Sequence, residues 1–121
     1  MRRFATRLMT GLAAVVLVAA QEGVFSDARE LVQRVQSDLR HVRHRGARND
    51  KEHDRIEAAQ KHLSDFDRNL SRNRFARDRL DESIDDVRNI VDNNTLEAGD
   101  RDALSGDLAD LRRLRDVRGN M

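Results

Sequence analysis

Two aliphatic runs at helical spacing lie in the second half of the chain, and they restrict the fold more than any other feature of the sequence. The first run steps by four, three and four residues, and the second by four, three and three. The runs are Leu80, Ile84, Val87 and Val91, and then Leu104, Leu108, Leu111 and Leu114. Because such spacing places each run on one face of a helix, the pattern predicts a helical hairpin.

The segment that connects the two runs has the residues of a helix-helix turn. Asn93 and Asn94 tolerate the left-handed conformation that ends a helix, and we expect Leu96 to fold back onto the last helical turn. Asp100 is placed to cap the second helix with its carboxylate. The connection therefore predicts that the two helices are antiparallel neighbours.

The first half of the chain carries two further seams with the same alternation of three and four residues. They are Ala28, Val32, Val35, Leu39 and Val42, and then Ile56, Ala59, Leu63, Phe66 and Leu70. The first of these helices is expected to begin at Ser26, which is a common N-cap residue, and to end at Gly46, which is a common C-terminal cap. Asn49 or Asp50 then starts the next helix. Seams this narrow are typical of helices that pack on other helices.

Two interpretations compete for Ser71 to Arg77. In the first, the segment is a turn, with Phe75 fixed to the core and Asp78 capping the following helix. In the second, one continuous helix of about 40 residues, about 60 Å long, covers residues 52–91. We expect the turn, because a continuous helix would place two polar residues, Asn73 and Arg77, in the apolar seam.

Composition supports an all-α fold. The chain has no proline or cysteine, and hydrophobic residues make up 38% against 37% charged, so the core must be aliphatic and thin. We expect one helical domain over residues 21–121, a three- or four-helix antiparallel bundle built from helical hairpins and preceded by a signal peptide helix. The expected helices span about residues 26–45, 50–71, 78–93 and 100–115, and the residues from Val117 onward are expected to fray.

Residues 1–20 have the composition of a bacterial secretory signal peptide. Three arginines precede a 13-residue apolar run that ends at Ala20, and this run is shorter than the ~20 residues that cross a bilayer as a helix. We expect cleavage between Ala20 and Gln21, which gives a periplasmic or secreted protein without a membrane segment. An uncleaved N-terminal anchor is the alternative.

Charge is unevenly distributed along the expected mature chain. Without the three arginines of the signal, 20 basic side chains remain against 22 acidic ones, which lacks the basic surplus that nucleic-acid binding requires. Residues 26–48 carry six arginines against three acids, and residues 78–110 carry eleven acids against three arginines. Two interpretations are open: the basic helix packs beside the acidic hairpin of its own chain, or the acidic surface binds a basic partner or another copy.

Three histidines form the strongest candidate site in the sequence. His41 and His44 are three residues apart on the first expected helix, and His53 follows the turn. Imidazoles with this spacing bind zinc, copper or nickel, so one hypothesis is a periplasmic metal-binding protein that uses these three residues. Adjacent arginines oppose a bound cation, and solvated surface histidines are the alternative interpretation.

Carboxylates cluster in two places, but they lie off the apolar seams and are expected to face water. The clusters are Asp78, Asp81, Glu82, Asp85 and Asp86, and then Asp100, Asp102, Asp107 and Asp110. Paired carboxylates act as general acid and base when burial separates their proton affinities, which requires a pocket. The sequence also has no nucleophile-base constellation, so we expect neither an enzyme nor a cofactor.

In size, export signal and helical hairpins, the chain resembles small periplasmic stress chaperones that dimerise into helical cradles. The repeated Leu-Thr-x-x-Gln signature of that family is absent, so the resemblance concerns architecture and carries over no residue. The thin core and narrow seams also indicate that a second copy completes the core. We therefore expect an interaction module, chaperone-like or self-associating, that binds an envelope protein or itself without catalysis.

Overall fold

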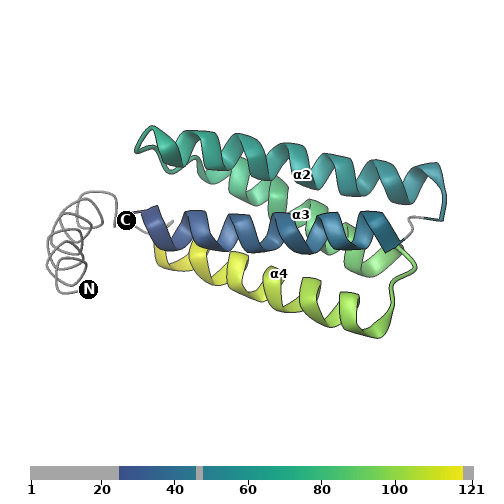
Figure 1. Cartoon of the computed structure of the whole chain (residues 1–121). Helices are drawn as coiled ribbons and strands as arrows, with labels where there is room; N and C mark the ends of the chain where they lie inside the picture. Colours follow the sequence, from purple (N-terminus) through teal and green to yellow (C-terminus); the bar gives the residue numbers. More distant parts are fainter. Residues whose placement is uncertain (1–24, 46–47, 119–121) are drawn as a thin grey trace, which may run out of the picture.

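The computed structural model describes residues 25–45 and 48–118, and this part of the chain is all-helical (Figure 1). The first helix covers residues 25–45. It is followed by α2 (Asp50–Ser71), α3 (Arg77–Asn93) and α4 (Ala98–Arg118). The all-α prediction is confirmed, and the four helical segments expected from the seams are present.

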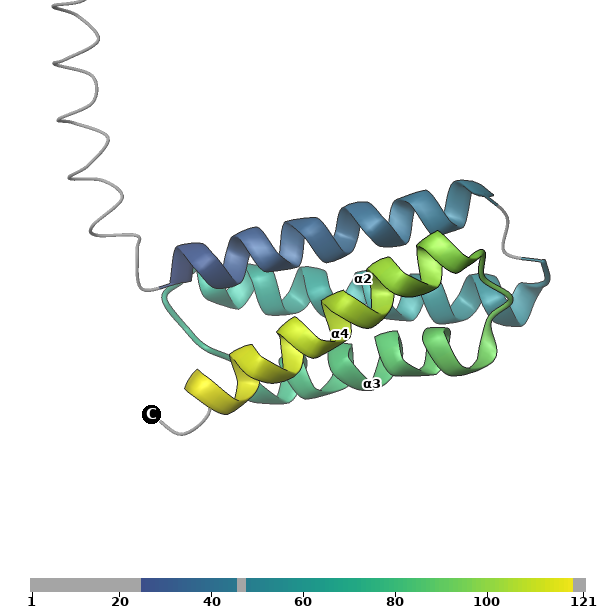
Figure 2. The ribbon, with the colours of Figure 1, turned by 90° about the horizontal axis from the view of Figure 1, so that it is seen from below.

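The four helices run alternately up and down, and each has two neighbours. One end of the bundle holds the start of the 25–45 helix, the α2–α3 turn and the end of α4, as Figures 1 and 2 show from two directions. One polar side-chain contact from each interface illustrates the closed arrangement: Arg29–Asp67 at 3.0 Å, His62–Glu82 at 2.9 Å, Arg115–Asp81 at 3.8 Å and Arg34–Asp107 at 3.2 Å. The bundle therefore closes on itself within a single chain.

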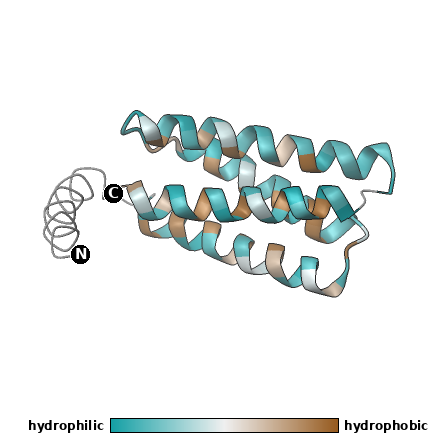
Figure 3. Ribbon diagram, in the orientation of Figure 1, coloured by the Kyte–Doolittle hydropathy of each residue, from teal (hydrophilic) through white to brown (hydrophobic). Residues whose placement is uncertain are grey.

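The core consists of the predicted seams with one change. Apolar residues, brown in Figure 3, recur along all four helices. Fourteen of the eighteen seam residues are exposed by 3% or less, Val42 by 6% and Leu108 by 7%, and Leu114 is partly buried at the edge of the core. In α3 it is Ile90 that is fully buried, whereas the predicted Val91 packs at the edge. The step from Val87 to Ile90 is three residues, and it follows the step of three from Ile84 to Val87.

The segment between α2 and α3 is a turn, so the prediction of two separate helices is confirmed. Asn73 takes the left-handed conformation with a φ of 60°, which asparagine tolerates better than most residues. Phe75 packs edge-to-face on Phe66 with ring centroids 5.4 Å apart. The predicted cap is wrong, because α3 begins after Ala76, which makes no side-chain cap, and Asp78 lies inside the first turn.

The caps around α4 also differ from prediction. Asn94 has an extended backbone, with φ of −87° and ψ of 151°, because its side chain bonds to the start of α2 and holds the connection open. The helix begins at Ala98, so Asp100 lies in its first turn and is not the cap, and the helix continues to Arg118. Leu96 packs on the core as expected.

The start of α2 follows the sequence prediction. Asn49 Oδ1 accepts a hydrogen bond from the backbone N–H of Glu52 at 3.0 Å, which identifies Asn49 as the N-cap. The predicted signal peptide, the Gly46 cap and residues 119–121 lie outside the described residues. Within residues 25–45 and 48–118, no helix has the length and apolar character needed to cross a membrane.

Candidate functional site

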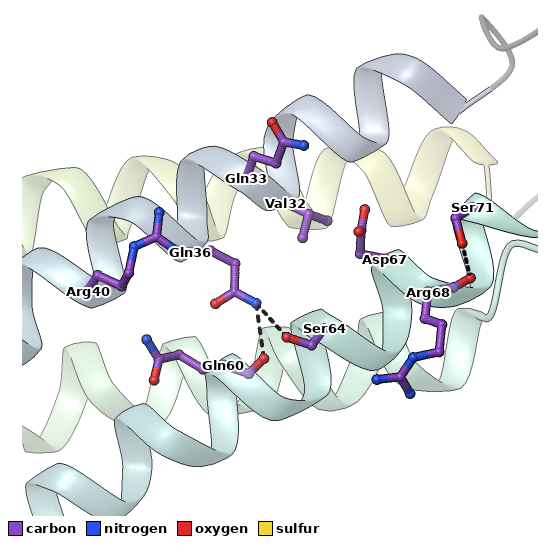
Figure 4. A pocket seen from close by; sticks show the side chains of 9 residues that line it. All are labelled: Val32, Gln33, Gln36, Arg40, Gln60, Ser64, Asp67, Arg68 and Ser71. Carbon is purple, nitrogen blue, oxygen red and sulfur yellow. Dashed lines mark hydrogen bonds between the residues drawn. The ribbon is translucent and has the colours of Figure 1, made fainter.

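An open groove runs between the 25–45 helix and α2 (Figure 4). Its volume is about 750 Å³. The lining residues are those that flank the two apolar seams, so most are polar: Val32, Gln33, Gln36, Arg40, Gln60, Ser64, Asp67, Arg68 and Ser71. The groove exists because two narrow seams hold the helices together while their flanking side chains leave space above the contact.

Hydrogen bonds across the groove fix part of its lining. Gln36 Nε2 donates to the backbone oxygen of Gln60 at 3.0 Å and to Ser64 Oγ at 3.1 Å, as the dashed lines in Figure 4 mark. Near one end, Arg29 donates to both carboxylate oxygens of Asp67, at 3.0 and 3.4 Å. These bonds hold the two walls at a fixed separation.

Two side chains on the 25–45 helix side of the groove are available to a ligand. Gln33 and Arg40 are exposed, and within the described part of the chain neither makes a side-chain hydrogen bond or ion pair. Together they offer amide and guanidinium donors and one amide acceptor. The volume is typical of ligand sites, but those are mostly apolar, so this lining favours a polar, hydrogen-bonding ligand.

Of the three predicted metal-site histidines, His41 and His44 are exposed and His53 is half-buried, and His41 and His53 contact different groups. His41 accepts a hydrogen bond from Arg45 Nε at 3.1 Å and lies 3.8 Å from Asp100. His53 Nε2 lies 3.1 Å from Glu57 Oε1 and 3.3 Å from Arg43. Over residues 25–45 and 48–118, no group of three or more possible ligands is arranged to hold a metal ion. The metal site stays a prediction, and His41, His44 and His53 would have to move closer together to bind one ion.

The sequence reasoning overlooked the histidine with the most extensive carboxylate contacts. His62, on α2, lies between two carboxylates of α3: its Nε2 is 2.9 Å from Glu82 Oε2, and its Nδ1 contacts Asp86. The sequence signal was the spacing of four between the two acids, which places them on one face of a helix.

The basic first helix packs beside acidic α4, so the first interpretation of the uneven charge is confirmed. Arg34 bonds to Asp107 and Asp110, and Arg45 bonds to Glu97. These contacts run in opposite chain directions along the two helices, as an antiparallel pair requires. Exposed pairs of this kind contribute ~0 to 1 kcal/mol each and mainly select which helices become neighbours.

The prediction that the second carboxylate cluster faces water is wrong for Asp107. Its side chain is only 3% exposed, and Arg34 Nε donates to Oδ1 at 3.2 Å. The other oxygen, Oδ2, is buried without a donor, while the carboxyl group of Asp38 lies within hydrogen-bonding reach. Asp100 is also buried, so the prediction is wrong for this residue as well. α4 is rotated so that the residue preceding Leu108 enters the interface with the 25–45 helix.

Burial and a neighbouring carboxyl group raise the pKa of Asp107 to about 7, against an ordinary value of 3.8. Removal from water contributes most, the hydrogen bond and charge of Asp38 add to it, and Arg34 partly opposes it. Between about pH 4 and pH 7 the carboxyl group is protonated in the folded chain and ionised in the unfolded chain. Its contribution to the free energy of unfolding is therefore complete below about pH 4 and is lost as the pH rises to about 7.

Comparison with known proteins adds no assignment. The sequence matches no family model, and neither a curated protein nor a solved structure is similar enough to count as a match.

Proposed function

We propose that the chain is an exported bacterial interaction module that binds a partner protein in the groove between the 25–45 helix and α2, without catalysing a reaction. The observation that carries this proposal is the groove itself: an open site of about 750 Å³ with amide and hydroxyl groups along both walls. Such groups exchange hydrogen bonds with a peptide chain and perform no acid-base or nucleophilic chemistry in this arrangement.

The closed core supports a polar mode of binding. All five seam residues of the 25–45 helix are buried against the other helices of the same chain, so no second copy is needed to cover them. Among the described residues, Val117 is the one large hydrophobic side chain that is exposed, at 64%. A partner, whether an envelope protein or another copy, therefore contacts hydrogen-bonding and charged groups and not an apolar patch.

Substitution at the groove rim tests this proposal. We expect the double variant Gln33→Ala/Arg40→Glu of mature chain 21–121 to retain about tenfold less partner protein from an envelope extract, equivalent to ~1.4 kcal/mol. The reason is that it removes the free amide and reverses the free charge of the rim. Its melting temperature should stay close to that of the unsubstituted chain, because exposed, unpaired side chains contribute little to stability.

A matched control separates the groove from general electrostatics. Arg112 is also exposed, and in the described structure its side chain makes no ion pair, but it lies on α4 away from the groove. Retention of partner by Arg112→Glu should equal that of the unsubstituted chain. Equal loss in both variants, or no loss in the groove variant, would contradict binding in the groove.

Export is the second part of the proposal. We expect mass spectrometry of the protein from a periplasmic or medium fraction to show an N-terminus at Gln21, because the short apolar run favours a cleaved signal over an anchor. Exported protein that still begins at Met1 would show that the segment is kept.

A further inference from the structure

A stripe of polar residues lies beside the apolar seam of the 25–45 helix and faces α4. Its members, at steps of four, three and four residues, are Arg34, Asp38, His41 and Arg45, and they meet Asp110 and Asp107, Asp107, Asp100 and Glu97 respectively. Three of the four positions pair a basic group with an acid. Asp38 is the exception, because it places a carboxyl group against another carboxyl group.

The surroundings of Asp107 leave this pair without a full complement of donors. Arg34 donates to one oxygen of Asp107 but also to Asp110, and Oδ2 has no donor. Among the buried residues of α2 and α3, the one ionisable group is Glu52, which is engaged by the backbone N–H groups of Arg48 and Thr95. A proton held between the two carboxyl groups is therefore the donor that satisfies Oδ2.

We infer that the Asp38–Asp107 carboxyl pair is a proton-operated latch that holds the 25–45 helix against α4. With one proton, the pair forms a hydrogen bond across the interface. Without it, two negative charges face each other beside a buried oxygen that lacks a donor, and both effects push the helices apart. The latch opens as the pH rises through neutrality, in the direction given by the raised pKa of Asp107.

Opening is expected to remain local. The 25–45 helix keeps its contacts with α2, which include the bidentate pair of Arg29 with Asp67 and the bonds from Gln36. The helix is thus released on its α4 side while its groove side stays attached.

Amide hydrogen exchange of the whole mature chain between pH 5.5 and 8.5, corrected for the intrinsic chemical rate, tests the latch without any partner. Over this pH range, we expect the exchange protection factors of the 25–45 helix to fall about tenfold more than those of α2 and α3. A tenfold change corresponds to a pKa difference of about one unit. The carboxyl carbon of Asp107, followed by NMR, should titrate near neutral pH. A titration near pH 4, or equal pH dependence in all helices, would overturn the latch.

Two variants and a control locate the effect. Asp107→Asn and Asp38→Asn each leave one ionisable group and supply an amide donor, so both should abolish the pH-dependent loss of protection. Asp38 is only half-buried, so its variant provides the test if the other does not fold. Asp102→Asn, exposed on the same helix, should behave like the unsubstituted chain. If the folded carboxyl variants still lose exchange protection as the pH rises, the latch is refuted. If only partner binding fails, the proposed binding groove is contradicted and the latch is not.

Discussion

Replacing Phe66 with alanine is expected to lower the free energy of unfolding by about 3 to 5 kcal/mol. Phe66 is fully buried and is among the largest buried side chains of the described structure. Its ring meets Phe75 edge-to-face, and Phe75 in turn lies 6.1 Å from Phe25, centroid to centroid. Removal of the ring therefore leaves a cavity where α2, the turn and the start of the 25–45 helix come together.

Urea unfolding followed by circular dichroism measures this effect. Small domains have total stabilities of about 5 to 15 kcal/mol, so the alanine variant should be partly unfolded at a moderately raised temperature. Phe66→Leu is the matched control, because it keeps most of the buried volume and should lose clearly less. A loss under about 1 kcal/mol in the alanine variant would mean that the core collapses around the vacated space or that the ring is not packed as described.

Replacing Glu52 with alanine should cost about 2 to 4 kcal/mol, a large loss for a charged residue. Glu52 is 5% exposed, and its carboxylate accepts hydrogen bonds from the backbone N–H of Arg48 at 3.0 Å and that of Thr95 at 2.9 Å. Its own backbone oxygen accepts from Asn94 Nδ2 at 3.1 Å. The residue thus ties the start of α2 to the α3–α4 connection, and alanine strands two donors.

The pH dependence of this loss has a defined sign. The hydrogen bonds from Arg48 and Thr95 lower the pKa of Glu52 below its ordinary value of 4.5, against the effect of burial. Its contribution is therefore present above pH 4.5 and is lost as the pH falls through the native pKa. The difference in unfolding free energy between unsubstituted chain and Glu52→Ala should shrink in acid.

A control on the same helix keeps this prediction specific. Glu57→Ala removes an exposed carboxylate that pairs with Arg43 and His53, and it should change stability by less than about 1 kcal/mol. Equal losses in the two variants would show that helix charge, and not the bridge to the α3–α4 connection, accounts for the effect.

Glu52 and Asp107 give the protein opposite responses to pH. Protonation of Glu52 destabilises the fold in acid, whereas ionisation of Asp107 destabilises it toward neutrality. Neither role was predicted from the sequence, although Asn49 and Glu52 have the spacing of a capping box. The pattern identifies a helix start, but it does not reveal that the carboxylate also reaches a loop more than forty residues away.

Sequence periodicity predicted the apolar seams of the helices, because the spacing of apolar side chains is a local property of each helix. The break between α2 and α3 was expected from polar residues that would otherwise enter the seam. Tertiary structure decided which residues beside the seams are buried. Asp107 enters the interface and Ile90 replaces Val91 in the core because each helix rotates about its axis until its seam meets two neighbours. That rotation depends on all four helices together, so the groove and the carboxyl pair emerge only from their packing.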